Sequence, residues 1–201
     1  MANYFRCDTT KVKNSNAGGR LFSGKLKEAK EIPNGMFAFM GGYVEGENEI
    51  RELSAPTAEL IKAEIPVLIH KPEINYKEES ATDAALGIYR NRAGQILRVF
   101  PMEKWDEITL SEDFFDKTEK GNSKIEVGDV YTLQANMDAG KQLKYAASAP
   151  NSETARVYFK VTRVANSHIP VFVGGDGQMF PQAYKLIDIE ICINEPVAAQ
   201  A

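Results

Sequence analysis

Apolar and polar residues alternate along most of this chain, in short runs that end at Gly, Pro or Asn. Alternation with a period of two is typical of strands that bury one face, and the intervening residues are typical of turns. The pattern is clearest toward the C-terminal end. We expect strands at residues 26–32, 36–44, 50–53, 66–70, 86–90, 96–100, 105–110, 143–147, 155–164, 169–173 and 183–193, and a turn that leads into a strand at 125–133.

Several local signals refine this pattern. The pair Gly41 and Gly42 inside a strand predicts a bulge or a bend. Residues 91–94, which end in Gly, predict a hairpin that joins 86–90 to 96–100. Ser111 followed by acidic residues predicts an N-capped helical turn. Residues 58–64 fit either a helical turn or a strand, and periodicity does not separate the two.

The number of short strands and the regular spacing of the turns predict an all-β (mainly β) fold. We expect a β-barrel or a β-sandwich with one or two short helical turns and flexible terminal segments. No stretch alternates strands with helices, which argues against a doubly wound α/β fold. The length of 201 residues favours a single β-rich domain, residues 1–201, over two small ones. Its polar start predicts an extended N-terminal arm at 1–20, and 195–201 a frayed tail.

Composition narrows the class of protein. Hydrophobic residues make up 43% of the chain and aromatic residues 9%, which is enough for a packed core. The 24 basic and 28 acidic residues give a net charge of -4 and are interleaved, so we expect no direct binding to nucleic acid. No secretory signal and no apolar run of membrane-spanning length is present, so we expect synthesis in the cytoplasm and no membrane contact.

The residues that most often build reactive sites are few. The two cysteines, Cys7 and Cys192, could form one disulfide, but we favour two buried free thiols. The two histidines, His70 and His168, have no ligand partner at short spacing, as a zinc site would require. The Gly-rich residues 174–177 lack the Lys and Ser or Thr of a phosphate-binding loop and predict a hairpin turn.

Acidic residues gather between positions 103 and 129 without the spacing of a calcium loop. We interpret them as a solvated face, or as a face that meets a basic partner. Phe114 and Phe115 fit core packing better than a partner anchor. The sequence thus predicts no catalytic, cofactor-binding or metal-binding residues, no cofactor, and a protein that is not an enzyme.

Four short segments carry a resemblance to a known group of proteins. They are residues 4–12 (YFRCDTTKV), 72–76 (PEINY), 86–94 (LGIYRNRAG) and 127–131 (VGDVY). Together they span roughly residues 1–135, and they contain no catalytic signature. In this order they resemble head-associated proteins of tailed bacteriophages.

The resemblance implies a virion structural protein that decorates or stabilises the capsid. Its partners would be the major capsid protein lattice and copies of itself, and its location would be the virion, after synthesis in the host cytoplasm. The resemblance assigns no site residue and does not extend beyond residue 135. Two alternatives stay open: a tail, baseplate or glycan-binding adhesin module, and a small β-fold hydrolase in which two carboxylates, or a carboxylate and His70 or His168, converge.

Overall fold

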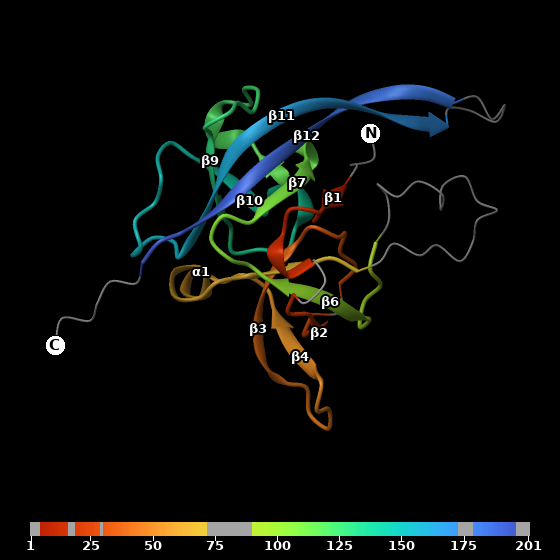
Figure 1. Ribbon diagram of the computed structural model, residues 1–201, viewed down its shortest axis with the longest axis vertical. Coiled ribbons are helices and arrows are strands. Elements are labelled where there is room, and N and C mark those ends of the chain that lie inside the picture. Colours follow the sequence, from red (N-terminus) through yellow and green to blue (C-terminus); the bar gives the residue numbers. More distant parts are fainter. Residues whose placement is uncertain (1–4, 16–18, 29, 72–89, 173–178, 196–201) are drawn as a thin grey trace.

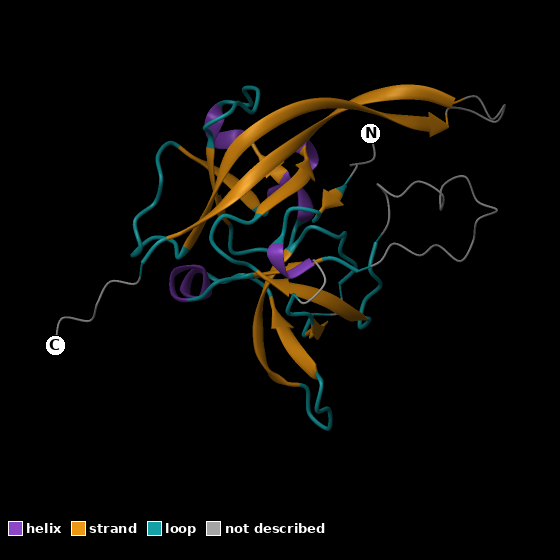
Figure 2. Cartoon of the chain, in the orientation of Figure 1, coloured by secondary structure: helices purple, strands orange, loops and turns teal. Residues whose placement is uncertain are grey.

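The computed structural model describes residues 5–15, 19–28, 30–71, 90–172 and 179–195. Within these ranges the chain folds mainly as β-strands, which confirms the predicted fold class (Figure 2). It forms one closed barrel and one open seven-stranded sheet, so the barrel alternative is confirmed for the first half of the chain.

The barrel is built from five strands in the order β2-β4-β3-β5-β6. β2 is parallel to β4, and the other pairs are antiparallel. The predicted bulge is confirmed, because the register of β3 against β4 shifts between Met40 and Tyr43. The strands are β2 (Phe22–Leu26), β3 (Phe37–Tyr43), β4 (Ile50–Ser54), β5 (Val67–Ile69) and β6 (Ile96–Pro101).

The second sheet has the order β1-β7-β12-β11-β9-β10-β8. Its two long central strands form one antiparallel hairpin, and the only parallel pair is β10 with β8. Figure 1 shows this hairpin running across the molecule and past the body at one end. The strands are β1 (Cys7–Asp8), β7 (Glu107–Ser111), β8 (Phe115–Asp116), β9 (Val130–Leu133), β10 (Leu143–Ala146), β11 (Val157–Phe172) and β12 (Met179–Ile193).

One continuous apolar cluster joins the barrel to the sheet. Alternate residues of the long strands, such as Phe159 and Ile189, are fully buried on the face that meets the barrel. The rings of Phe37 in β3 and Phe159 in β11 lie 4.8 Å apart. Because period-two alternation buries one face of each strand, the sequence pattern and the observed core agree.

Residues 58–64, which fitted a helix or a strand, contain the helix α1 (Ala58–Ala63). The hydroxyl oxygen of Thr57 accepts a hydrogen bond from the N–H of Leu60 (3.3 Å), which caps the first turn. Short 3-10 turns complete the described elements: η1 (Lys13–Ser15), η3 (Glu112–Phe114), η4 (Thr118–Lys120) and η5 (Ala139–Lys141).

The extended arm predicted at residues 1–20 is wrong for residues 5–15, which pack on the body. Phe5, Cys7 and Val12 are buried, and β1 pairs with β7. The ring of Phe5 contacts Phe114 edge-on at 4.8 Å. The many polar residues here misled the prediction, because the few apolar ones are the residues that anchor the segment. Of the predicted tail at 195–201, residues 196–201 lie outside the described part of the chain.

Two local predictions need correction, and a third, the hairpin of 86–90 with 96–100, is not tested by the described residues. The strand predicted at 26–32 ends at Leu26, and Ile32 forms a single bridge to Asn91. The hairpin partner predicted at 86–90 lies almost wholly outside the described residues, and β6 pairs with β2 and β5. Ser111 does not cap η3 with its side chain, because its hydroxyl oxygen accepts the N–H of Arg6 (3.0 Å).

Candidate interaction surface

The most unusual feature of the fold is the outer part of the β11–β12 hairpin. We call residues 166–172 of β11 and residues 179–185 of β12 the arm. β7 pairs with β12 no further out than Leu186, and β9 pairs with β11 no further than Lys160. Among the described strands, none lies beside the arm on either edge, so it is a two-stranded ribbon (Figure 1). Its seven residue pairs reach roughly 24 Å, at about 3.4 Å per residue.

The outer half of the arm is rich in apolar residues. Of the eight residues 169–172 and 179–182, seven are apolar, and the eighth is Gln182. Pro170 lies directly opposite Pro181 in the register. A ladder tolerates proline only where its missing N–H faces outward, so both edges lack a donor at this point. Proline at a sheet edge is a common way to limit uncontrolled strand pairing.

A cluster of charged and hydroxyl side chains lies where the arm leaves the sheet. The register of β11 shifts between Val161 and Arg163, which makes Thr162 the extra residue of a bulge. Asp188, whose side chain is 1% exposed, accepts hydrogen bonds from Arg163 Nε (2.7 Å) and Thr109 Oγ1 (2.8 Å). A bulge increases the local twist of a strand, so this cluster fixes the direction in which the arm projects.

The electrostatics of the cluster keep Asp188 ionised. Burial alone raises the pKa of Asp188, but the hydrogen bonds from Arg163 and Thr109 and the charge of Lys11 outweigh it, and the pKa is lowered. Lys11 pairs with Glu107, and this hydrogen bond raises the pKa of Lys11. A general acid needs a carboxyl group whose pKa is raised. Asp188 therefore fits a structural ion cluster better than the general acid of a hydrolase.

The predicted histidines and cysteines lie apart in the fold. His70 follows β5 in the barrel, with its ring 6.2 Å from that of Phe100, whereas His168 is an exposed residue of the arm. Cys7 and Cys192 are both free, which confirms the prediction of two thiols, although Cys192 is only partly buried. Burial raises the pKa of Cys192, which disfavours the reactive thiolate.

Residues 174–177 lie outside the described part of the chain. Within residues that are described, no group of three or more His, Cys, Asp and Glu side chains could hold a metal ion.

The acidic residues between 103 and 129 do not form one solvated face. Asp106 is buried, and its carboxylate accepts the N–H groups of Lys13 (2.9 Å) and Glu103 (2.8 Å). Asp129 accepts a hydrogen bond from Lys120 Nζ (2.5 Å). These acids therefore organise turns, which sequence position alone did not indicate. Phe114 and Phe115 are buried, as predicted for core residues.

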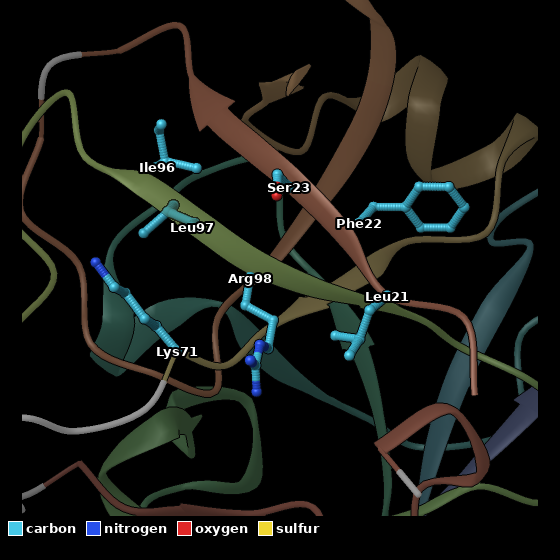
Figure 3. Close-up of a pocket in the computed structure, with 7 residues that line it drawn as sticks. All are labelled: Leu21, Phe22, Ser23, Lys71, Ile96, Leu97 and Arg98. Carbon is cyan, nitrogen blue, oxygen red and sulfur yellow. The ribbon is translucent and has the colours of Figure 1, made fainter. Parts of the chain in front are cut away.

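A shallow hollow of about 440 Å³ lies on the outer side of β2 and β6 (Figure 3). Leu21 and Ile96, each about half exposed, supply apolar surface, and Lys71 and Arg98 supply positive charge. Among the described residues that line the hollow, none carries a carboxylate. It therefore suits contact with an acidic surface that carries apolar side chains.

Trp105 is the only tryptophan, and it is 69% exposed in the turn before β7. Its φ of 77° is a left-handed conformation that is strained for a large side chain. Tyr43, 53% exposed, lies at the end of β3 in the barrel, with Arg51 over its ring. Among the residues whose side chains are described, these two exposed aromatics lie in different parts of the fold, one in a barrel strand and one in a turn before β7, and they do not share a groove.

The arm was not predicted as a unit, although the sequence carries a signal for it. Folding the chain about the glycines at 174–177 places Pro170 opposite Pro181 and Arg163 opposite Asp188. Two long alternating runs of similar length around one turn thus indicate a single ribbon. The bulge after Val161 hid this relation, because it shifts the alternation by one residue.

Comparison with known proteins yields no relative. The chain matches no known protein family, no curated protein and no solved structure. None of the helices in the described residues is long and apolar enough to cross a membrane.

Proposed function

We propose that this chain is a structural protein of a tailed-bacteriophage particle, which binds the major capsid protein lattice and uses its arm as the main contact. The observation that carries the proposal is the arm itself. A two-stranded ribbon with no third strand is only marginally stable in water on its own. Contact with a partner would stabilise the ribbon, because burial of apolar surface is favourable. Seven of the eight residues of its outer half are apolar.

The base of the arm also supports this role. The ion cluster around Asp188 connects β7, β11 and β12 with Lys11, so the arm projects from a rigid part of the sheet. A fixed base limits the directions in which the arm can project, so less conformational freedom is lost on binding. Contacts of modest strength, repeated over many lattice positions, would then add up to reinforcement of the capsid.

The hollow between Leu21 and Arg98 is a second contact surface in this proposal. Its positive charge contrasts with the net charge of -4 of the whole chain. Complementary charge mainly sets orientation and the rate of encounter with a partner, whereas buried apolar contacts provide affinity. We therefore expect the arm to dominate binding and the hollow to modulate it.

Co-sedimentation with capsids that lack the protein tests the proposal. The informative variant deletes residues 166–185 and joins Ala165 to Leu186 through Asn-Gly, a turn suited to two-residue hairpins. A matched control shortens the exposed turn between β3 and β4 at residues 45–48 in the same way. Circular dichroism establishes that both variants are folded.

The proposal predicts that the full chain and the control sediment with capsids, whereas the variant without the arm stays in the supernatant. Failure of the full chain to bind capsids would overturn the capsid role. Binding that persists without the arm would overturn the role of the arm. Sedimentation with purified tails in place of heads would favour the tail or adhesin alternative.

A further inference from the structure

No described strand covers the edge of β11 from the bulge outward. β9 covers this edge as far as Lys160, and Asp129, just before β9, extends the contact to Val161, whose N–H donates to the carbonyl of Asp129 (2.9 Å). Beyond it, the N–H groups of Val164, Asn166 and His168 have no backbone partner within residues 5–15, 19–28, 30–71, 90–172 and 179–195. An open edge of this kind is a template for another strand.

The register determines which groups face outward. The N–H of Ile191 in β12 donates to the backbone carbonyl of Asp106, which lies on the side of β12 away from β11. Every second residue of β12 shares this orientation, and Pro181 is one of them. Pro170, its direct partner, then also faces outward on β11. By the same alternation, Val164, Asn166 and His168 present both N–H and C=O on the open edge.

We infer that two copies of this chain pair through this edge, β11 against β11, as antiparallel strands about a two-fold axis at Asn166. Asn166 then lies opposite Asn166 of the other copy, and Val164 lies opposite His168 in both directions. Each of these opposed pairs exchanges two hydrogen bonds. Two-fold pairing of identical edges is self-complementary, so it forms a closed dimer and not an open fibre.

Charge and proline favour this arrangement over other strand pairings. Arg163 is the only charged residue between Thr162 and Phe172, and antiparallel pairing separates the two copies of Arg163 to opposite ends. A parallel pairing would bring them side by side. Pro170 lacks an N–H, so it limits the pairing to the inner part of the arm and leaves the outer part for a different partner.

This dimer goes beyond the proposed function and does not depend on it. Pairing occupies the open edge of β11, whereas capsid contact requires the outer, apolar half of the arm. The test uses the purified full-length chain alone. Its failure would therefore leave the capsid role untouched, and failure of capsid binding would leave the dimer untouched.

Light scattering coupled to size exclusion, with a dilution series, measures the pairing. Asn166→Pro removes an outward N–H and does not disturb the ladder to β12. Ala183→Pro is the matched control, because Ala183 also faces outward on the ribbon but on the β12 edge. We expect a dimer for the full chain and for Ala183→Pro. Asn166→Pro should raise the dissociation constant roughly tenfold or more, since each copy loses a donor.

A monomeric full chain at all concentrations would overturn the inference, and so would equal dissociation of the two proline variants. Hydrogen exchange provides a readout without substitution. The amides of Asn166 and His168 should exchange more slowly as concentration rises, whereas the amide of Ala183 should not change. Concentration-independent exchange of Asn166 in the presence of a dimer would place the interface elsewhere and contradict the inference.

Discussion

Gln142 joins the barrel to the seven-stranded sheet, and its replacement tests how much one buried amide stabilises the fold. Its side chain is fully buried beside β3, at a point where β4 does not reach, because β4 pairs with β3 only from Phe39 onward. Oε1 accepts the N–H of Phe37 (2.8 Å), and Nε2 donates to the carbonyl of Phe37 (2.7 Å). The side chain of Gln142 thus makes the two hydrogen bonds that a neighbouring strand would make with Phe37.

Gln142→Met keeps a side chain of similar length but cannot make either hydrogen bond. It leaves the N–H and C=O of Phe37 buried without partners. Each of these two groups costs about 1–3 kcal/mol, so we expect the free energy of unfolding to fall by about 2–6 kcal/mol. That is a large share of the ~5–15 kcal/mol that stabilises a typical domain.

Urea unfolding followed by circular dichroism measures this loss. Gln134→Met is the matched control, because Gln134 is only partly buried and donates to Asp116 at 3.1 Å. We expect the control to cost less than about 1 kcal/mol. A loss below about 1 kcal/mol for Gln142→Met would contradict this prediction, since two buried polar groups without partners should destabilise the fold by more than that. Equal losses in both variants would also refute it.

Three further predictions follow from local geometry. Burial raises the pKa of Asp188, but the hydrogen bond from Arg163 and its other partners lower it overall, so its carboxylate stabilises the fold above the unfolded pKa of about 3.9. That contribution is lost as pH falls through the folded pKa. Unfolding measured at neutral and at acid pH should therefore show that the loss in free energy of unfolding caused by Asp188→Asn becomes smaller toward acid pH. A loss that does not change with pH would contradict this prediction. Trp105→Asn should raise the free energy of unfolding by about 0.5–1 kcal/mol, since Asn tolerates a positive φ. Thermal unfolding measures this change. A variant less stable than the original chain would contradict the prediction and show that the exposed indole contributes packing. Gly24→Ala should lower the free energy of unfolding by about 1–3 kcal/mol, because the added carbon would lie 2.6 Å from a buried leucine of β4. Gly41→Ala is the control, since its added carbon meets only ordinary contacts at 3.6 Å. Equal urea midpoints for the two variants would contradict the close packing at Gly24.

The sequence predicted the class of fold because period-two alternation is a local property. Strands such as 36–44 and 143–147 need no knowledge of their partners, and their observed bounds agree closely. Closure of the barrel depends on the parallel pair β2–β4, which no local pattern encodes. The predicted strand at 26–32 failed for a related reason, because the chain leaves the barrel after Leu26 to reach Asn91.

The candidate interaction surface was less predictable than the fold. Asp188 lies at an ordinary polar position of an alternating strand, and its pairing with Arg163 depends on a bulge that adds one residue to β11. The open edge of β11 depends on where β9 stops, which is a property of the whole sheet. Surfaces defined by the absence of a neighbour cannot be derived from the alternation of a single strand.

The proposal that this chain is a component of a phage particle is tested most directly by the composition of purified virions. Quantitative mass spectrometry of gradient-purified, salt-washed particles measures the chain relative to the major capsid protein. A virion component should stay with the particles at a fixed ratio to the capsid protein. A chain that is abundant in the lysate but absent from washed particles would rule out a role in the particle.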